Sequence, residues 1–233
     1  MGIELFSLII PTYNEARNIL PLLQNVHHAL GSRPHEVIVV DDASPDGTGD
    51  IVKAFSLEHP YVRLVVRENE RGLSGAVIRG IEESRGSILG VIDGDQSHDE
   101  RILPQLLAAV ESGADLAVGS RRIPGGGADY WPWYRRLTSS LATLLAKSVL
   151  HVRLSDPMSG YFVMKRALYV RCQGKLMAGG YKILLEIYCK TLPTAVTEIP
   201  YVFRDRTQGH SKISLRVLLL YLISLSQLRK DVA

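Results

Sequence analysis

Five short apolar runs alternate with segments of helical periodicity over the first 120 residues, and no other feature constrains the fold as strongly. The runs are LFSLII (5–10), EVIVVDD (36–42), VRLVVR (62–67), SILGVID (87–93) and DLAVGS (115–120). The segments between them are amphipathic, and one helix is expected to begin with Thr48 as its N-cap. Strands that are apolar throughout and separated by helices form mostly parallel sheets covered on both faces. The sequence therefore predicts an α/β fold.

The character of the chain changes at residue 121. Residues 121–136 are rich in glycine and aromatic residues and are expected to form a long loop. The expected elements that follow are a helix (137–150), a turn and strand (156–166), a helix (181–191), a strand (194–204) and a polar loop (205–212). No internal repeat accompanies this change, so the second half is expected to complete the fold of the first.

The composition is that of an ordinary globular protein, with 46% apolar and 22% charged residues among 233. A net charge of +3 permits a phosphate-bearing partner without requiring one, and we expect no nucleic-acid partner. Cys172 and Cys189 form no CxxC pair, which argues against a disulfide framework or a zinc site. The N-terminus lacks the pattern of a signal peptide, and no apolar run has the length of a membrane span.

Polar and acidic residues follow three of the expected strands, in the segments PTYNE (11–15), DDASPDG (41–47) and DGDQSHD (93–99). In open α/β sheets, ligands bind at the carboxyl ends of the strands, where these segments would meet. The sequence therefore predicts an acidic binding site at one edge of the sheet.

Asp93 and Asp95 are the strongest candidates for metal ligands. If the strand continued past Asp93, carboxylates two residues apart would project to the same side. Such a pair suits a hard divalent cation, Mg²⁺ or Mn²⁺, which keeps waters and takes substrate phosphate oxygens. Ser97 or His98 is expected to add a further ligand. The alternative is a simple turn stabilised by aspartate and glycine.

Two other acids each have two candidate roles. Asp42, at a strand end, is a candidate to accept hydrogen bonds from a nucleobase or ribose, and the alternative is a solvated turn acid. Glu15 is either a ribose contact or a favourable acid near a helix N-terminus. Neither GxGxxG nor GxxxxGK[ST] occurs, so dinucleotide and P-loop functions are excluded.

Eight segments in this order resemble glycosyltransferase family two, and within it the dolichyl-phosphate mannose synthase group. They are IIPTYNE, VIVVDDASPDGT, RGLSGAVIRGI, VIDGDQSHD, VGSRR, DPMSGYFVMKR, GYKILLEI and RDRTQGHSK. The resemblance covers about residues 7–212 and implies a GT-A fold. The most diagnostic pieces are DPMSGY, GYK and the late R-x-x-G-x-S-K, formed by Arg206, Gly209, Ser211 and Lys212.

The resemblance implies transfer of mannose from GDP-mannose to a dolichyl or polyprenyl monophosphate, with inversion. The implied nucleotide contacts are Pro11, Tyr13, Glu15, Val40, Asp42, Asp93 and Gly94. The implied metal ligands are Asp93, Asp95 and Ser97, although the family often has glutamine at the position of Ser97. The implied catalytic residues are Asp95, Arg121, Lys182 and Arg206, and the implied contacts of the acceptor phosphate are Arg136, Ser139, Lys182 and Arg206.

The same resemblance divides the chain into a nucleotide-sugar half (1–120), an acceptor half (121–212) and an amphipathic C-terminal helix (213–233). Acidic residues in the first half are expected to bind the donor. Basic residues in the second half are expected to bind the phosphates. Arg122 and Lys165 are expected to be surface charges only.

An acceptor with a long apolar tail requires access to a membrane. The aromatic and basic segment 130–136 and the C-terminal helix suit a bilayer interface, and the alternative is that both pack on the core. We expect a peripheral protein on the cytoplasmic face of a membrane, the endoplasmic reticulum in a eukaryote and the plasma membrane in a prokaryote, with a membrane-anchoring subunit as a possible partner.

Two alternative functions remain open from the sequence. One keeps the reaction but uses UDP-glucose or another donor. The other is a nucleotide-sugar-binding protein without catalysis.

Overall fold

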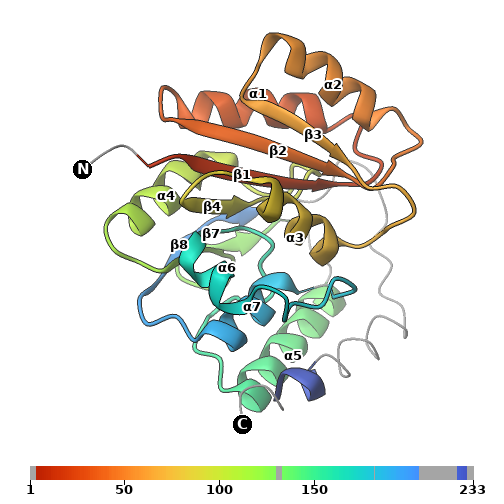
Figure 1. The fold of residues 1–233 in the computed structure, drawn as a ribbon. Coiled ribbons are helices and arrows are strands. Elements are labelled where there is room, and N and C mark those ends of the chain that lie inside the picture. Colours follow the sequence, from red (N-terminus) through yellow and green to blue (C-terminus); the bar gives the residue numbers. More distant parts are fainter. Residues whose placement is uncertain (1–3, 130–132, 181, 205–224, 230–233) are drawn as a thin grey trace.

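The structure is a computed structural model that describes residues 4–129, 133–180, 182–204 and 225–229, with the side chains of residues 134–136 left out. Strands and helices alternate through the first half (Figure 1). The elements are β1 (Phe6–Thr12), α1 (Ile19–Leu30), β2 (His35–Asp41), α2 (Thr48–Glu58), β3 (Val62–Val66), α3 (Leu73–Glu83), β4 (Ile88–Val91), the 3₁₀ turn η1 (Glu100–Ile102), α4 (Leu103–Glu111) and β5 (Leu116–Ser120), then β6 (Gly127–Ala128), α5 (Trp133–Leu150), β7 (Phe162–Lys165), α6 (Arg166–Cys172), α7 (Ile183–Thr191), β8 (Val196–Pro200) and β9 (Val202–Phe203).

Seven strands form one mostly parallel sheet in the order β3-β2-β1-β4-β7-β5-β8, which confirms the predicted α/β fold. Strand β7, from the second half of the chain, runs antiparallel between β4 and β5. Both halves therefore share one sheet, and the division at residues 120 and 121 stays a prediction. A second, small sheet pairs β6 with β9.

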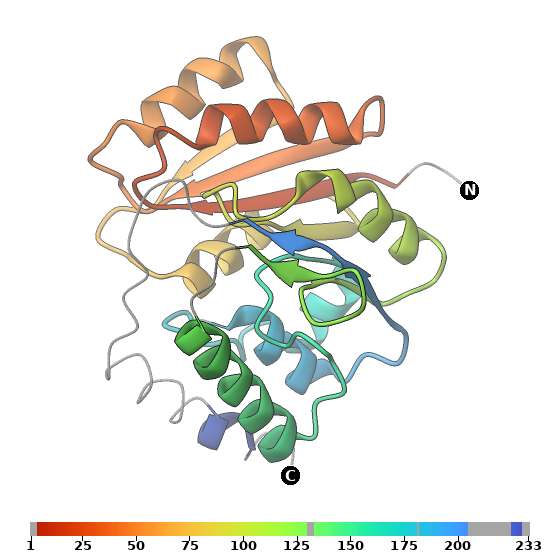
Figure 2. The same cartoon turned by 180° about the vertical axis from the view of Figure 1, so that it is seen from behind.

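Both faces of the sheet are covered, as the apolar strands predict (Figures 1 and 2). Alternate residues of β1 point to opposite sides: Leu8 and Ile10 pack with α1, α2 and α4, and Ile9 packs with α3, α6 and α7. All three side chains are fully buried. The parallel pairings of β1 with β2 and with β4 bring the carboxyl ends of these three strands to the same edge of the sheet.

Three local predictions were wrong. Thr48 is the first residue of α2 and not its cap, since Asp46 accepts hydrogen bonds from both the backbone nitrogen and the hydroxyl of Thr48. The segment 121–136 is not a continuous loop, because β6 lies within it and α5 begins at Trp133. Helix α6 was not predicted at all.

The predicted C-terminal helix falls mostly outside the described residues. In the described part, residues 225–229 are helical, and Leu225 and Leu228 are buried in the core cluster that also contains Ala146 and Leu150 of α5. These two leucines therefore favour packing on the core for this part of the segment.

Candidate active site

A cavity of about 370 Å³ lies at the carboxyl ends of β1, β2 and β4. The lining residues come from the three predicted acidic segments and from the start of α3. They are Pro11, Thr12, Tyr13, Glu15, Asp42, Arg71, Gly72, Leu73, Ala76, Asp93, Gly94 and Asp95. The predicted convergence of the strand ends on one site is thus confirmed.

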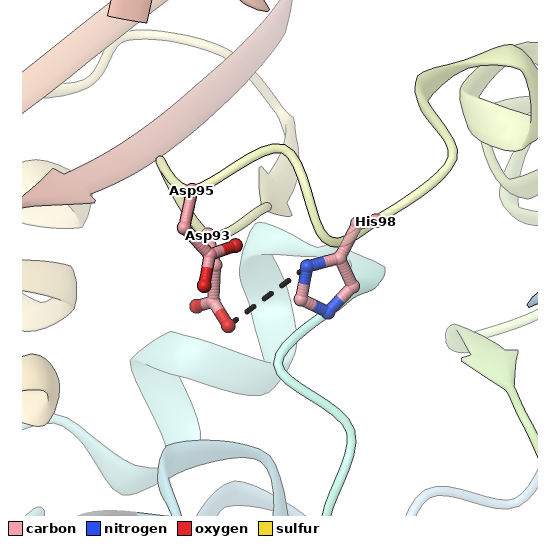
Figure 3. A group of neighbouring side chains, drawn as sticks. All are labelled: Asp93, Asp95 and His98. Carbon is pink, nitrogen blue, oxygen red and sulfur yellow. Dashed lines mark ion pairs between the residues drawn. The ribbon is translucent and has the colours of Figure 1, made fainter. Parts of the chain in front are cut away.

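Asp93, Asp95 and His98 form a candidate metal centre beside this cavity (Figure 3). Each side chain offers one ligand atom, and these atoms all lie within 4.8 Å of one another. His98 Nδ1 is 3.8 Å from Asp93 Oδ2. The carboxylates converge because of a turn and not because the strand continues: β4 ends at Val91, and Gln96 has a φ of 59°.

Ser97, the predicted third ligand, instead hydrogen-bonds to Asp95. Its hydroxyl and its backbone nitrogen donate to Asp95 Oδ1 at 2.5 and 3.0 Å. This contact orients the carboxylate, while His98 adds the third ligand atom of the group. Two carboxylates suit Mg²⁺ or Mn²⁺, so the residues present fit a divalent cation. The ligand role of Ser97 stays a prediction.

His98 is held rigidly by its surroundings. It is 1% exposed. Its ring stacks on Tyr201 and meets Tyr161 and Phe203 edge-on, with ring centres 5.3 to 5.6 Å apart. Because the imidazole is packed among aromatic rings, it is positioned before any cation binds.

Arg121 is fixed by a buried two-point ion pair. Its Nε and Nη2 donate to the Asp156 carboxylate at 2.6 and 2.9 Å, and Asp156 is fully buried. Burial by itself would raise the pKa of Asp156, but the hydrogen bonds and charge of Arg121 outweigh it and lower that pKa. Asp156, the first residue of DPMSGY, was not assigned a role from the sequence.

Lys182 directly precedes α7 and interacts electrostatically with this pair. Although part of the residue is exposed to solvent, burial lowers the pKa of its ammonium. The charge of Arg121 lowers that pKa further, while Asp93 and Asp156 act in the opposite direction. Two cations thus interact electrostatically with the Asp93 carboxylate of the candidate metal centre, and this combination of charges is suited to binding phosphates.

The predicted nucleotide contacts separate into two groups. Six of them line the cavity, namely Pro11, Tyr13, Glu15, Asp42, Asp93 and Gly94. Val40 is not among the lining residues; its side chain is fully buried in the core, and its carbonyl accepts from the Thr12 hydroxyl at 3.4 Å.

We expected acidic residues of the site to come from the first half of the chain and basic residues from the second half. This division does not hold strictly. Arg67, in the first half, forms a buried ion pair with Asp42 at 2.7 Å, and Arg71 lines the cavity. Conversely, Asp156 in the second half holds Arg121. Each side of the site therefore combines both signs of charge.

The predicted acceptor contacts are less fully described. Ser139 on α5 accepts a hydrogen bond from Arg122 at 2.9 Å, so Arg122 has a structural partner beyond its surface charge. The side chain of Arg136 and the whole of Arg206 lie outside the described part of the chain. Their assignment stays a prediction.

Left-handed backbone follows the strands at the site. Asn14, Ala43 and Gln96 have φ values of 62°, 49° and 59°, and each is next to a predicted site residue. For alanine and glutamine this region is disfavoured, and such strain concentrates at functional sites. The backbone at these three positions therefore supports a functional role for the cavity.

The close approach of Gly160 to Asp93 explains why DPMSGY has a glycine at its fifth position. A Cβ on Gly160 would lie 2.9 and 3.0 Å from the Asp93 carboxylate oxygens.

We expect Gly160→Ala to displace Asp93 and to weaken divalent-cation binding about tenfold, as changes beside a metal ligand do. Calorimetric titration with Mn²⁺ measures this. Gly179→Ala is the control, because its Cβ would meet nothing within 4 Å. Equal Mn²⁺ affinity in both variants would contradict the role of Gly160.

The chain matches the Glycosyl transferase family 2 description over residues 7–171. It is 38% identical to a dolichol-phosphate mannosyltransferase of Saccharomyces cerevisiae, covering 98% of this chain and 88% of the relative. A dolichol-phosphate mannosyltransferase of Pyrococcus furiosus is also 38% identical, over 96% of this chain and 63% of the relative. A polyprenol monophosphomannose synthase of Mycolicibacterium smegmatis is 36% identical, over 89% and 80%.

Solved structures agree on the fold. Glucosyl-3-phosphoglycerate synthase from Mycobacterium tuberculosis, in complex with Mn²⁺, UDP-glucose and phosphoglyceric acid, superposes with a TM-score of 0.70 at 20% identity. The match covers 96% of this chain and 80% of that one. The mostly parallel sheet, with an acidic site at its strand ends, therefore has the GT-A fold. The chain belongs to glycosyl transferase family 2.

Proposed function

We propose that this enzyme transfers mannose from GDP-mannose to a dolichyl or polyprenyl monophosphate. One observation carries the proposal: the cations Arg121 and Lys182 interact electrostatically with Asp93 of the candidate metal centre, so two phosphate-bearing substrates have complementary charge in one site. The relatives named above as dolichol- and polyprenol-phosphate mannosyltransferases support this acceptor and this sugar.

The proposed reaction is a single displacement. An oxygen of the acceptor phosphate forms a bond to C1 of mannose as the bond from C1 to the diphosphate oxygen breaks. The electron pair leaves with GDP, and attack from the opposite face inverts the configuration. The second pKa of a phosphate monoester is about 6, so the acceptor is largely ionised at neutral pH and needs no strong general base.

The residues then act mainly by binding and orientation. Arg121, fixed by Asp156 along one edge of its guanidinium, and Lys182 bind phosphate oxygens and keep two anions close together. A divalent cation held by Asp93, Asp95 and His98, either Mg²⁺ or Mn²⁺, would neutralise the departing diphosphate. Ser97 holds the Asp95 carboxylate in place.

A donor panel tests the proposed function. The protein is incubated with Mn²⁺ or Mg²⁺, a polyprenyl monophosphate and radiolabelled GDP-mannose, UDP-glucose or UDP-GlcNAc, and label in the organic phase is counted. We expect label from GDP-mannose. Label from a UDP-sugar alone would replace the donor and keep the mechanism. No label from any donor, with membranes also added, would leave the non-catalytic alternative.

We further propose that α5 contacts a membrane surface. None of the helices in the described part of the chain combines the length and hydrophobicity that crossing a bilayer requires. Yet α5 exposes an apolar stripe at helical spacing, formed by Trp133, Leu137, Leu141, Leu144 and Leu145. Such a stripe suits a peripheral position, which we assign to the cytoplasmic face, with or without an anchoring subunit.

The double variant Leu141→Gln/Leu144→Gln is expected to lose most of its binding to liposomes, because each glutamine replaces an apolar contact with the acyl boundary. Co-sedimentation with anionic vesicles measures the change. Val170→Gln on α6 is the control, since Val170 is also exposed. Equal sedimentation of the double variant and the control would contradict the role of α5.

A further inference from the structure

The short segment 201–204, which contains β9, is tied by its backbone to two parts of the active site. The nitrogen of Tyr201 donates to the carbonyl of Ser120, at the end of β5, at 3.1 Å. The nitrogen of Arg204 donates to the carbonyl of Ser97, in the turn after β4, at 2.9 Å. Between these two anchors, β9 pairs with β6. The segment is therefore held in place relative to both the end of β5 and the turn after β4.

Phe203 lies in this segment and contacts a functional residue next to each anchor. It is 7% exposed. Its ring meets the imidazole of His98 edge-on, with the ring centres 5.6 Å apart. The guanidinium carbon of Arg121 lies over the same ring, 5.4 Å from its centre. One buried side chain thus connects a residue of the candidate metal centre with a cation of the phosphate-binding group.

The Phe203 ring complements the ion pair that Arg121 forms with Asp156. The two hydrogen bonds to one carboxylate hold an edge of the guanidinium, but they allow its plane to tilt about that edge. A guanidinium within about 6 Å of an aromatic ring centre is attracted to the face of the ring. Phe203 therefore limits the tilt, and with it the direction in which Arg121 meets a phosphate.

The same ring limits the motion of His98. The Nδ1 atom of His98 is 3.8 Å from Asp93 Oδ2 (Figure 3). Rotation of the imidazole would move this nitrogen away from the carboxylate. Tyr201 stacks on the imidazole, and the Phe203 ring is inclined to it by 80°. Because side chains packed around a ligand keep it in one rotamer, Phe203 helps to hold Nδ1 toward the candidate metal centre.

We propose that Phe203 is a positioning residue for both His98 and Arg121, and so sets the position of the candidate metal centre relative to the phosphate-binding cation. This inference rests on the proposed function, which assigns the departing diphosphate to the first group and the attacking phosphate to the second. The two anions must lie on opposite sides of the sugar C1, where small displacements cost much of the rate. Phe203 itself touches neither substrate.

Mn²⁺ titration tests the contact with His98. Phe203→Leu keeps an apolar side chain but removes the ring, and is expected to weaken Mn²⁺ binding about tenfold, as loss of a group that orients a metal ligand does. Calorimetry with the full chain and no substrate measures this. Val202→Ala is the control, because Val202 is on the same strand but 39% exposed. Phe203→Leu is expected to have little further effect beside His98→Ala.

Binding of a short-chain polyprenyl monophosphate in EDTA tests the contact with Arg121. We expect Phe203→Leu to weaken this binding about threefold, the effect of a modest cation–π contact. No further loss is expected beside Arg121→Met/Asp156→Leu, in which both charges of the ion pair are absent. The metal-free condition separates this effect from that on His98.

Transfer kinetics at saturating Mn²⁺ test the joint role. We expect kcat of Phe203→Leu to fall about a hundredfold, because the two anions are misplaced relative to each other. The KM of the sugar donor is expected to change little. A loss of stability alone would reduce the amount of folded enzyme and not the Mn²⁺ affinity of the folded fraction. Thermal melting checks each variant, and Phe203→Met, whose flexible side chain fills irregular space, replaces a leucine variant that does not fold.

The outcomes separate this inference from the proposed function. Wild-type Mn²⁺ affinity and wild-type kcat in Phe203→Leu would overturn the role of Phe203, as would additive losses beside His98→Ala. Wild-type protein that binds Mn²⁺ but transfers sugar from no donor would instead overturn the proposed function. The Mn²⁺ titrations would then still decide whether Phe203 positions His98.

Discussion

Asp95→Asn lowers the rate of sugar transfer about a thousandfold, since a divalent cation that loses one of two carboxylates loses several kcal/mol of charge stabilisation. The fold is expected to survive. The asparagine oxygen still accepts from Ser97, and removing one of two neighbouring negative charges relieves repulsion in the metal-free protein. The melting temperature without metal therefore stays equal or rises slightly.

The informative measurement is the shift in melting temperature with Mn²⁺, taken beside the transfer assay. Wild-type protein is stabilised by the cation, whereas Asp95→Asn gains little, because ligand binding stabilises only the state that binds. Asp50→Asn, an acid in the first turn of α2, serves as the matched control. A variant with normal transfer and a normal Mn²⁺ shift would remove Asp95 from the metal site.

Asp156→Ala is expected to destabilise the protein by about 3–5 kcal/mol, because it leaves the guanidinium of Arg121 buried without its partner. Urea denaturation measures the loss of free energy of unfolding. Glu111→Gln removes one member of the exposed pair with Arg33 and is expected to cost less than about 1 kcal/mol. Comparable losses in the two variants would show that the Asp156 pair is not structural.

The charge-free pair Arg121→Met/Asp156→Leu separates stability from function. Replacing both partners by apolar groups is expected to restore most of the stability, since no buried charge is left unpaired. Transfer activity is not expected to return, because Arg121 is lost from the phosphate-binding group. Recovery of both stability and activity would assign Arg121 a purely structural role.

The same pair gives stability a dependence on pH. The pKa of Asp156 is lowered in the folded protein, so the folded state holds the carboxylate ionised more strongly than the unfolded chain does. Its contribution is complete above the unfolded pKa of about 4 and is lost as the pH falls through the folded value. Asp156→Ala is therefore expected to lose less stability than the wild type as the pH falls below about 4.

Local sequence patterns were enough to predict the order of strands and helices in the first half of the chain and the acidic edge of the sheet. These features are local: apolar runs of strand length, helical periodicity and turn-forming acids such as Asp93 and Asp95 act within a few neighbouring residues. The motif DPMSGY also indicated a functional segment, although the sequence did not show what Asp156 and Gly160 contact.

Which distant side chains contact one another depends on the tertiary structure. In the sheet, β7 lies between β4 and β5. The segment before β7 therefore brings Asp156 to Arg121 and Gly160 next to Asp93. It likewise brings Asp42 to Arg67, and a turn after β4 selects His98 beside the two carboxylates. Apart from the local contact of His98, these contacts join residues tens of positions apart. They depend on strand order and packing, which local sequence patterns do not specify.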